Sequence, residues 1–385
     1  MTATFSKTLP GSSFTTVESI ADVSEFESYR EEWGELLNGS DSDCLFLTWE
    51  WLTTWWKHLG GDRQLSIVAV RCGEKLVALA PLCVRAPSLL HRRPLPVLEF
   101  LGNGCVGSDY LDLIVRRGYE VEARQALVSA LAQRRQVIDW AQLRQGCSFA
   151  SGVASDLVGR HWSAAEAVTN TCPFISLSGV SWETYMATLG SEHRYNFHRK
   201  WRRLNRSHCV TFERVDREEQ CRESIDLAIK LHNMRWRDHG RSDAFHTAGL
   251  VQFHREFCLL ALRHGWLRLY ILRLNEKPAA CLYGFLYGGT FYFYQSGFDP
   301  AYQKQSVGLV SMGLGIKSAI EEGAYEYDLL HGSEEYKSHW SRESRELSRL
   351  ELYPPGAVGR TFRRSVKLER TSRRIARRVL TGLFV

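Results

Sequence analysis

The sequence has no apolar run that approaches the roughly 20 residues needed for a membrane-spanning helix. Residues 1–16 also lack the basic-then-apolar pattern of a secretory signal. These two absences predict a cytoplasmic protein. No C-x-x-C pair occurs, and the ten cysteines are spread singly between Cys44 and Cys281. This spacing argues against a zinc site or a disulfide framework, so we expect reduced, buried thiols and no metal.

The composition, with 44% hydrophobic and 24% charged residues over 385 positions, is typical of a soluble globular protein with two domains. The net charge is +6, but residues 360–379 alone contain nine Lys or Arg and one acid. The folded body is therefore close to neutral, and the basic character belongs to a C-terminal tail, 356–385. This tail is a candidate amphipathic helix for an anionic membrane surface, which would place the protein peripherally on the inner membrane face. A disordered, solubilising tail is the alternative.

The first half predicts alternating helices and strands. Apolar residues at helical spacing predict a helix over 24–37. In the aromatic segment 46–56, Trp51 and Trp55 share a helix face, which favours core packing over a stacking platform. We expect further strands over 65–72, 76–84, 97–101, 110–115 and 137–140, and further helices over 120–133 and 150–161.

The second half repeats this plan. Its hairpin turns at Asn275–Lys277, as the first hairpin turns at Gly73–Lys75, and each hairpin precedes further strands and a helix. The repetition predicts a duplicated α/β unit, with one copy over 18–165 and the other over 172–355. The expected helices of the second copy are 181–189, 192–206, 216–236, 247–263 and 306–322, and its strands are 210–215, 266–274, 278–287, 290–297, 325–330 and 346–353.

Several motifs carry a family resemblance. They are residues 298–302, 306–308, 327–332 and 336–340 in the second half, and residues 46–51 and 108–113 in the first. As a set they resemble the BioF2-like acetyltransferase branch of the GNAT superfamily, which includes CelD-like proteins of cellulose and polysaccharide biosynthesis, and they are similar to the FemAB/FemX peptidyltransferases. The resemblance implies an α/β fold of tandem GNAT-like (acyl-CoA N-acyltransferase) units with mixed sheets flanked by helices. It also implies a structural first unit and a catalytic second unit.

The loop before the helix 306–322 is a candidate phosphate site. A helix N-terminus offers unpaired N–H groups and partial positive charge. The resemblance implies that this loop binds the pyrophosphate of acetyl-CoA or another acyl-CoA as co-substrate, through Lys304, Gln305, Ser306, Val307 and Gly308. An ordinary capped helix is the alternative. A second loop, Gly102–Gly107, matches G-x-G-x-x-G, but a strand rather than a helix is expected after it, so we interpret it as a connecting loop.

Acyl transfer needs a general base and a group that stabilises the developing oxyanion. Asp328, His331 and Glu334 are the candidate bases. The resemblance implies that Tyr336 protonates the departing thiolate and that Lys337 faces a phosphate or the reacting carbonyl. We expect Lys337 first and His331 second to carry the chemistry, although each of the five could instead be a surface charge or a local hydrogen-bonding group.

The helix 192–206 is strongly basic, and Arg194 and Arg199 are its candidate substrate-binding residues, with a solvated helix face as the alternative. The resulting hypothesis is an acyltransferase that moves an acetyl or longer acyl group from acyl-CoA to an amine or hydroxyl of a small molecule or saccharide, in polysaccharide or cell-envelope biosynthesis. One alternative is FemX-like transfer from aminoacyl-tRNA, although the helical insertion usual in tRNA-dependent relatives is not apparent, so tRNA is the less favoured partner. Another is a non-catalytic scaffold with the same fold. No DNA partner is expected.

Overall fold

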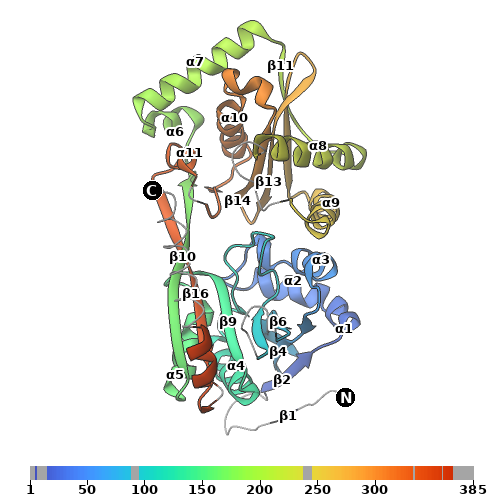
Figure 1. Cartoon of the computed structure of the whole chain (residues 1–385), viewed down its shortest axis with the longest axis vertical. Coiled ribbons are helices and arrows are strands. Elements are labelled where there is room, and N and C mark those ends of the chain that lie inside the picture. The colour runs from blue at the N-terminus through green and yellow to red at the C-terminus, as the bar shows by residue number, and fades with distance from the viewer. Residues whose placement is uncertain are drawn as a thin grey trace, which may run out of the picture.

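The computed structural model describes residues 5–6, 15–87, 95–236, 245–332, 334–357 and 359–366. Two α/β units follow each other along the long axis of the molecule (Figure 1). The N-terminal unit contains the helices α1 (Val23–Ser28), α2 (Arg30–Asn38), η1 (Leu45–Leu47), α3 (Trp49–Leu59), α4 (Glu120–Arg134) and α5 (Phe149–Gly159). Its strands are β1 (Phe5–Ser6), β2 (Thr15–Ile20), β3 (Gln64–Leu65), β4 (Ile67–Cys72), β5 (Lys75–Ala80), β6 (Leu82–Arg85), β7 (Val97–Phe100), β8 (Ile114–Val115) and β9 (Val137–Arg144).

The second half of the chain forms the C-terminal unit and the strands that connect it to the first. Its helices are α6 (Trp182–Thr188), α7 (Ser191–Ser207), α8 (Glu218–Trp236), α9 (Ala248–Arg263), η2 (Pro300–Gln305), α10 (Val307–Glu321) and α11 (Glu335–Ser338). Its strands are β10 (Ser163–Ser176), β11 (Val210–Arg214), β12 (Leu267–Leu274), β13 (Lys277–Tyr287), β14 (Thr290–Phe298), β15 (Glu326–Asp328) and β16 (Glu343–Tyr353).

The strands form two sheets, and the arrangement of parallel pairs supports duplication. One sheet has the order β1-β2-β4-β5-β8, and the other has the order β11-β12-β13-β14-β15-β10-β16-β9-β7-β6-β3. Within the described residues the strands pair in parallel at two places only, β7 with β9 and β14 with β15. In each case the connection contains one α-helix, α4 between β7 and β9 and α10 between β14 and β15, together with the short elements β8 and η2 respectively. Each unit thus repeats the same strand–helix–strand crossover.

Strands β10 and β16 join the two units. β10 pairs with β15 of the C-terminal unit at one end and runs antiparallel to β16 along most of its length. β16 in turn pairs with β9 of the N-terminal unit. Figure 1 shows these two long strands running from one unit to the other. β16, the last strand of the described residues, therefore lies between the two units in one continuous sheet.

The local structure explains where the sequence-based boundaries hold and where they fail. The second hairpin turns at Asn275 and Glu276 with left-handed φ values of 49° and 66°, as in a tight hairpin turn. The strand expected over 76–84 is divided at Pro81, which has no N–H to continue a ladder, and the chain changes sheet there. The strand expected over 110–115 is wrong except for β8, because Tyr110 has a left-handed backbone (φ 59°).

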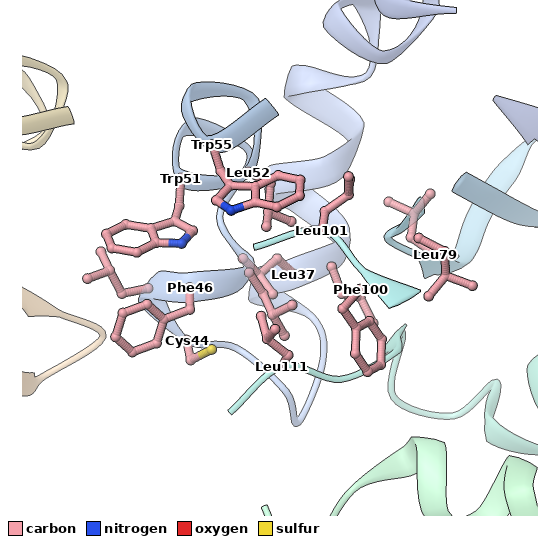
Figure 2. Packing of buried hydrophobic residues seen from close by; sticks show 14 of the residues in the cluster. Leu37, Cys44, Phe46, Trp51, Leu52, Trp55, Leu79, Phe100, Leu101 and Leu111 are labelled. Carbon is pink, nitrogen blue, oxygen red and sulfur yellow. The ribbon is translucent and has the colours of Figure 1, made fainter. Parts of the chain in front are cut away.

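The main hydrophobic core extends across both units. It contains α2 and α3 side chains together with Phe253 and Phe257 of α9 and residues of β12–β14. Trp51 and Trp55 are 0% and 1% exposed, so their prediction as core residues is confirmed. Figure 2 shows the Trp51 ring next to Phe46, with Trp55 and leucines of the same cluster nearby. A single core of this extent fixes the position of one unit against the other.

Two further expectations concern the membrane and the tail. No helix in the described part of the chain combines the length and apolar character that crossing a membrane requires. Phe362, near the start of the basic tail, is buried against Tyr353 at the end of β16, with ring centroids 6.3 Å apart. The remainder of the tail, 367–385, lies outside the described residues.

Candidate active site

The parallel strands β14 and β15 separate after a short paired stretch. They are paired from Thr290 opposite Glu326 to Tyr292 opposite Asp328. β15 ends there, whereas β14 continues to Phe298 and is paired along this length only with β13, as far as the described chain extends. The other edge of β14, over residues 293–298, therefore has no strand partner among the described residues and faces a wedge between the two strands.

The wedge contains a cavity of about 190 Å³. Its walls come from β13, β14, the first turns of α10 and the segment around α11, with one side chain each from α7 and α8. The wall is apolar along Phe293 and Trp340. It also includes a set of polar side chains, namely His193, Arg235, Ser296, Ser311, Tyr336 and His339.

The five residues expected to bind a cofactor lie together at the N-terminus of α10, beside this cavity. Lys304 and Gln305 are the last residues of η2, and Ser306 precedes α10 with a left-handed backbone (φ 58°). Val307 and Gly308 are the first helical residues. Ser306 forms no side-chain cap, so the first N–H groups of α10 remain donors suited to a phosphate.

The surroundings of this helix end favour an anion. The first turn of α10 contains no acidic residue, and the Lys200 ammonium of α7 donates a hydrogen bond to the Lys304 carbonyl at 3.4 Å. Gly308 lines the cavity, and an added Cβ there would lie 3.5 Å from the Phe298 ring, an ordinary contact. Packing within the protein therefore does not require this glycine, whose missing side chain leaves the cavity mouth open.

The corresponding helix end of the N-terminal unit has the opposite character. The first turn of α4 carries Glu120 and Glu122, and Glu120 accepts a hydrogen bond from the Gly118 N–H. Carboxylates at a helix N-terminus repel a phosphate and occupy its donors. The loop 102–107 after β7 opens no helix and leads toward the C-terminal unit, so its interpretation as a connecting loop is confirmed.

His331, just beyond β15, forms a close pair with Asp109 of the N-terminal unit. The Nδ1 atom of His331 lies 2.7 Å from Oδ1 of Asp109, and the His331 backbone N–H donates to Oδ2 at 2.9 Å. Asp109 is fully buried and also accepts a hydrogen bond from the Gln142 amide. Burial alone would lower the pKa of His331, but the charge and hydrogen bond of Asp109 outweigh burial and raise it. The carboxylate fixes the Nδ1–H tautomer and leaves Nε2 to accept a proton.

The loop that carries Asp109 is held in the C-terminal unit by additional bonds. The Tyr294 hydroxyl of β14 donates to the Val106 carbonyl, and a Cβ added to Gly107 would lie 3.7 Å from Cε1 of His331. The Tyr110 hydroxyl donates to the Asp328 carboxylate at 2.7 Å. The first unit therefore supplies side chains to the candidate site of the second.

Asp328 is buried beneath this site. Besides the Tyr110 hydroxyl, its carboxylate accepts the Leu330 N–H at 2.7 Å, and the Arg345 guanidinium lies 3.8 Å away. Burial raises the pKa of Asp328 to about 7, although these three partners oppose the shift. Asp328 can therefore hold a proton near neutral pH, but it is completely buried, and its hydrogen bonds shape the turn that presents His331.

Lys337 and Glu334 lie close to each other, below the same turn. The buried Lys337 ammonium donates to the carbonyls of Leu330 (3.3 Å) and His331 (2.9 Å), and it lies 3.0 Å from the Glu334 carboxylate. Two carbonyls therefore accept hydrogen bonds from the ammonium, and the Glu334 carboxylate balances its charge as an ion pair. A Cβ added to Gly332, whose φ is 145°, would overlap the Glu334 carboxylate and lie 2.5 Å from Nζ of Lys337. The arrangement indicates that Lys337 holds the His331 backbone in place.

Tyr336 lies on the cavity wall together with two polar neighbours. The Arg235 guanidinium is 5.3 Å from the Tyr336 ring centroid and donates to the Ser296 hydroxyl at 2.9 Å. Burial raises the pKa of Tyr336, despite the opposing effect of Arg235, so the phenol remains protonated at neutral pH. Among the five expected catalytic residues, Tyr336 alone lines the cavity, as far as the described residues show.

Arg194 and Arg199 lie on α7 and not on the cavity wall. The Arg194 guanidinium donates to the Ala187 carbonyl at the end of α6, and Arg199 bonds to Asn196 and stacks against Tyr195 on the exposed face. His193 is the α7 residue that reaches the cavity. No group of three or more His, Cys, Asp or Glu side chains within the described ranges is arranged to hold a metal ion.

Four residues that the structure places at the site were not predicted from the sequence: Asp109, Arg235, Ser311 and Arg345. Asp109 belongs to the segment 108–113, which was noted as a family motif without a role. That motif was the available signal. Arg235 and Ser311 lie within ordinary helices and carry no local signature.

Comparison with known proteins matches one segment of the chain to a family and the whole chain to several solved folds. Residues 191–338 match the family model of the acetyltransferase (GNAT) domain, and this segment contains α7, the wedge, the α10 N-terminus and His331. The fold is α/β, with two GNAT-like units in tandem and mixed sheets flanked by helices. No curated protein matches the sequence.

Solved structures resemble the chain over most of its length. The structure of FemX has a TM-score of 0.61 at 13% identity, over 84% of this chain and 95% of that chain. The C-terminal domain of a putative lysylphosphatidylglycerol synthetase from Agrobacterium fabrum has a TM-score of 0.51 at 11% identity, over 85% and 92%. A conserved protein of unknown function from Bacteroides thetaiotaomicron has a TM-score of 0.50 at 12% identity, over 85% and 97%. At these identities the likeness concerns the fold alone.

Proposed function

We propose that the protein transfers an acyl group from acyl-CoA to an amine or hydroxyl of an acceptor. The observation that carries this proposal is the cavity between β14 and α10, which joins an open strand edge to an uncapped helix N-terminus free of acidic residues. A helix end of this kind suits the pyrophosphate of acyl-CoA. An open strand edge suits the amides of the extended arm that carries the acyl group in the same molecule. Acetyl-CoA or another acyl-CoA contains both groups.

In this proposal the Asp109–His331 pair supplies the general base. As the acceptor nitrogen or oxygen attacks the acyl carbon, Nε2 of His331 takes the proton that the acceptor loses. Asp109 stabilises the resulting imidazolium from Nδ1 at 2.7 Å. When the carbon–sulfur bond breaks, the departing thiolate takes its proton from the Tyr336 hydroxyl. Lys337 and Asp328 act in this scheme by positioning His331.

The acceptor enters, in this proposal, through a second and more polar pocket. A pocket of about 280 Å³ lies between the two units, and its lining includes Asp43, Arg144, Tyr325 and Asp328. Carboxylates, a guanidinium and a phenol are suited to a hydroxyl-rich ligand, which supports a saccharide or polysaccharide precursor as acceptor. A role in polysaccharide or cell-envelope biosynthesis, on the inner face of a membrane reached through the basic tail, follows as part of the proposal.

Isothermal titration with acetyl-CoA tests the donor. We expect saturable binding that Lys304→Glu weakens on the order of tenfold, because the reversed charge faces the phosphates. Lys317→Glu is the matched control, since Lys317 lies toward the other end of α10 and bonds to Glu321. The absence of binding by acetyl-CoA and by longer acyl-CoAs would overturn the proposal.

A second candidate donor is an aminoacyl-tRNA, and the surface of α7 favours it. From residue 193 to residue 207 this helix has no acid, and Lys200 connects its basic face to the α10 N-terminus. This candidate predicts binding of tRNA that weakens steeply with salt, with no affinity for CoA. If neither donor binds and His331→Ala leaves the cellular phenotype intact, a non-catalytic scaffold becomes the better description.

A further inference from the structure

Two buried cysteines face each other between α8 and α9. The Sγ atoms of Cys221 in α8 and Cys258 in α9 lie 3.0 Å apart, and both residues are 0% exposed. The buried thiols of Cys44, Cys83 and Cys281 instead donate to backbone carbonyls. The sulfurs of a disulfide are about 2.05 Å apart, so an approach of about 1 Å would join Cys221 to Cys258.

Ion pairs on both sides of the two thiols hold the helices in register. Glu218 of α8 accepts two hydrogen bonds from the Arg263 guanidinium of α9, at 2.7 Å and 3.1 Å. Farther along α8, Asp226 accepts a hydrogen bond from Arg255 of α9 at 2.8 Å. The residue numbers rise along α8 as they fall along α9, so the helices are antiparallel and the two thiols meet between these ion pairs.

The two thiols are chemically unequal. The hydrogen bond with Cys258 lowers the pKa of Cys221, although burial opposes the shift. The same bond raises the pKa of Cys258, and burial adds to this effect. One sulfur is therefore the better nucleophile and the other remains a thiol beside it, which is the arrangement of a reactive cysteine and its resolving partner.

We propose that Cys221 and Cys258 form a reversible disulfide that links α8 to α9 when the protein meets a hydroperoxide. The Cys221 sulfur attacks one peroxide oxygen, the O–O bond breaks, and the departing hydroxide takes up the Cys221 proton as water. The Cys258 sulfur then attacks the sulfenic sulfur of Cys221, the S–O bond breaks, and the departing hydroxide takes up the Cys258 proton. Two thiols and one hydrogen peroxide thus give one disulfide and two waters.

The link would act on the stability of the protein and does not depend on the proposed function. Hydrogen peroxide is small enough to reach a buried thiol during local opening of the helices. The expected reduced thiols describe the protein in a reducing cytoplasm, where disulfides are rare and transient. The bond would connect residues 37 positions apart, which restricts the unfolded chain and so stabilises the folded one.

Peptide mapping by mass spectrometry tests the link in the native, full-length protein. After hydrogen peroxide treatment and alkylation in denaturant, we expect tryptic peptides 218–222 and 256–263 to be joined, and to separate on reduction. The thermal midpoint should rise by on the order of 5 °C on oxidation and return with dithiothreitol. Cys221→Ala should abolish both changes, whereas Cys281→Ala, at a buried thiol bonded to a carbonyl, should keep them.

Three results would contradict the proposal. If peptides 218–222 and 256–263 stay separate while the exposed Cys105 and Cys209 are oxidised, the buried pair does not react. If the peptides join only in urea, the link belongs to the unfolded chain. If they join in the native protein but the thermal midpoint falls, the packed helices do not accommodate the bond. The mapping uses the wild-type protein, so its result does not depend on the folding of Cys221→Ala.

Discussion

At the scale of single residues, the Asp109–His331 pair determines how activity should depend on pH. His331 acts as a base only when neutral, so activity should rise with pH as this group loses its proton. Asp109 raises the pKa of His331, and Asp109→Asn removes that effect. We therefore expect Asp109→Asn to move the acidic limb of the kcat/KM profile to lower pH, and to reduce the maximal rate by on the order of 10²-fold because the tautomer is no longer fixed.

Two further variants test whether His331 is the group that titrates. His331→Ala should lose about 10² to 10⁴ in rate and show no such limb. Asp156→Asn changes an exposed carboxylate of α5 and should leave rate and profile unchanged. An Asp109→Asn variant that retains the wild-type limb would show that His331 is not the titrating base.

The protonation of Asp328 should make the stability of the protein depend on pH. Its pKa is about 7 in the folded protein and near 3.8 when exposed, so between these values the folded state holds a proton that the unfolded chain has lost. The free energy of unfolding should therefore fall as pH rises from about 4 to about 7, by up to roughly 4 kcal/mol from this group. Asp328→Asn should reduce this dependence, measured by urea unfolding at pH 5 and pH 8.

The Asp328→Asn and Asp156→Asn variants together test the direction of this pH dependence. The free energy of unfolding of Asp328→Asn, relative to that of the wild type, should be higher at pH 8 than at pH 5, because the variant has no carboxylate to ionise in the folded state. Asp156→Asn should show the same difference from wild type at both pH values. An unchanged pH dependence in Asp328→Asn would mean that the buried carboxylate is already ionised at pH 5.

At the scale of elements, two helix glycines predict opposite outcomes for the same substitution. A Cβ on Gly313 of α10 would overlap the Phe197 ring of α7, whereas a Cβ on Gly34 of α2 would meet nothing within 4 Å. Gly313→Ala should cost about 1–3 kcal/mol through overpacking, and Gly34→Ala should gain about 0.5–1 kcal/mol because alanine favours the helix. Urea midpoints provide the measurement.

The Gly313 substitution should also affect the cavity, because α7 carries His193. A shift of α7 away from α10 would move that ring out of the wall, and donor affinity should fall together with stability. Gly34→Ala should leave donor affinity unchanged. Equal stability changes in the two variants would show that α7 and α10 do not pack as closely as the Phe197 contact requires.

The elements differ in how far the sequence could predict them. The second hairpin was predictable because a short polar segment with Asn275, a residue that adopts the left-handed backbone more readily than most, separates two apolar strands. Strand β10 was not predicted, because most of its side chains are exposed or half-buried and give no apolar alternation. It forms a strand because β15 and β16 pair with it, and those partners follow it by more than 100 residues.

The candidate site shows the same division between local and distant information. His331 and Asp328 were predictable from their position at the end of a short strand, and Gly308 from its position at the start of a helix. The pairing of His331 with Asp109 was not, because the two residues are 222 positions apart and meet only when the loop after β7 enters the other unit. Likewise, the buried hydrogen bonds of Lys337 depend on the turn above it.

At the scale of the whole molecule, the shared sheet and core imply that the two units unfold together. Trp51 of the N-terminal unit is fully buried, with its ring centroid 4.9 Å from that of Phe253 and 4.7 Å from that of Phe257, both in α9. β16 adds backbone bonds to both units through β9 and β10. Neither unit can lose its structure without exposing apolar surface and strand edges of the other.

Trp51→Ala should therefore destabilise both units by the same amount, about 3–5 kcal/mol, although the residue belongs to only one of them. Hydrogen exchange along a urea titration, followed by mass spectrometry of peptides from β4 and β12, reports the two units separately. Both peptides should lose protection at one shared midpoint in the wild type, and at one lower midpoint in the variant. Trp182→Ala, at a half-buried site in α6, should lower that midpoint less. Loss of protection in β4 alone would mean that the units fold independently, and that Asp109 reaches His331 across an interface which opens without unfolding.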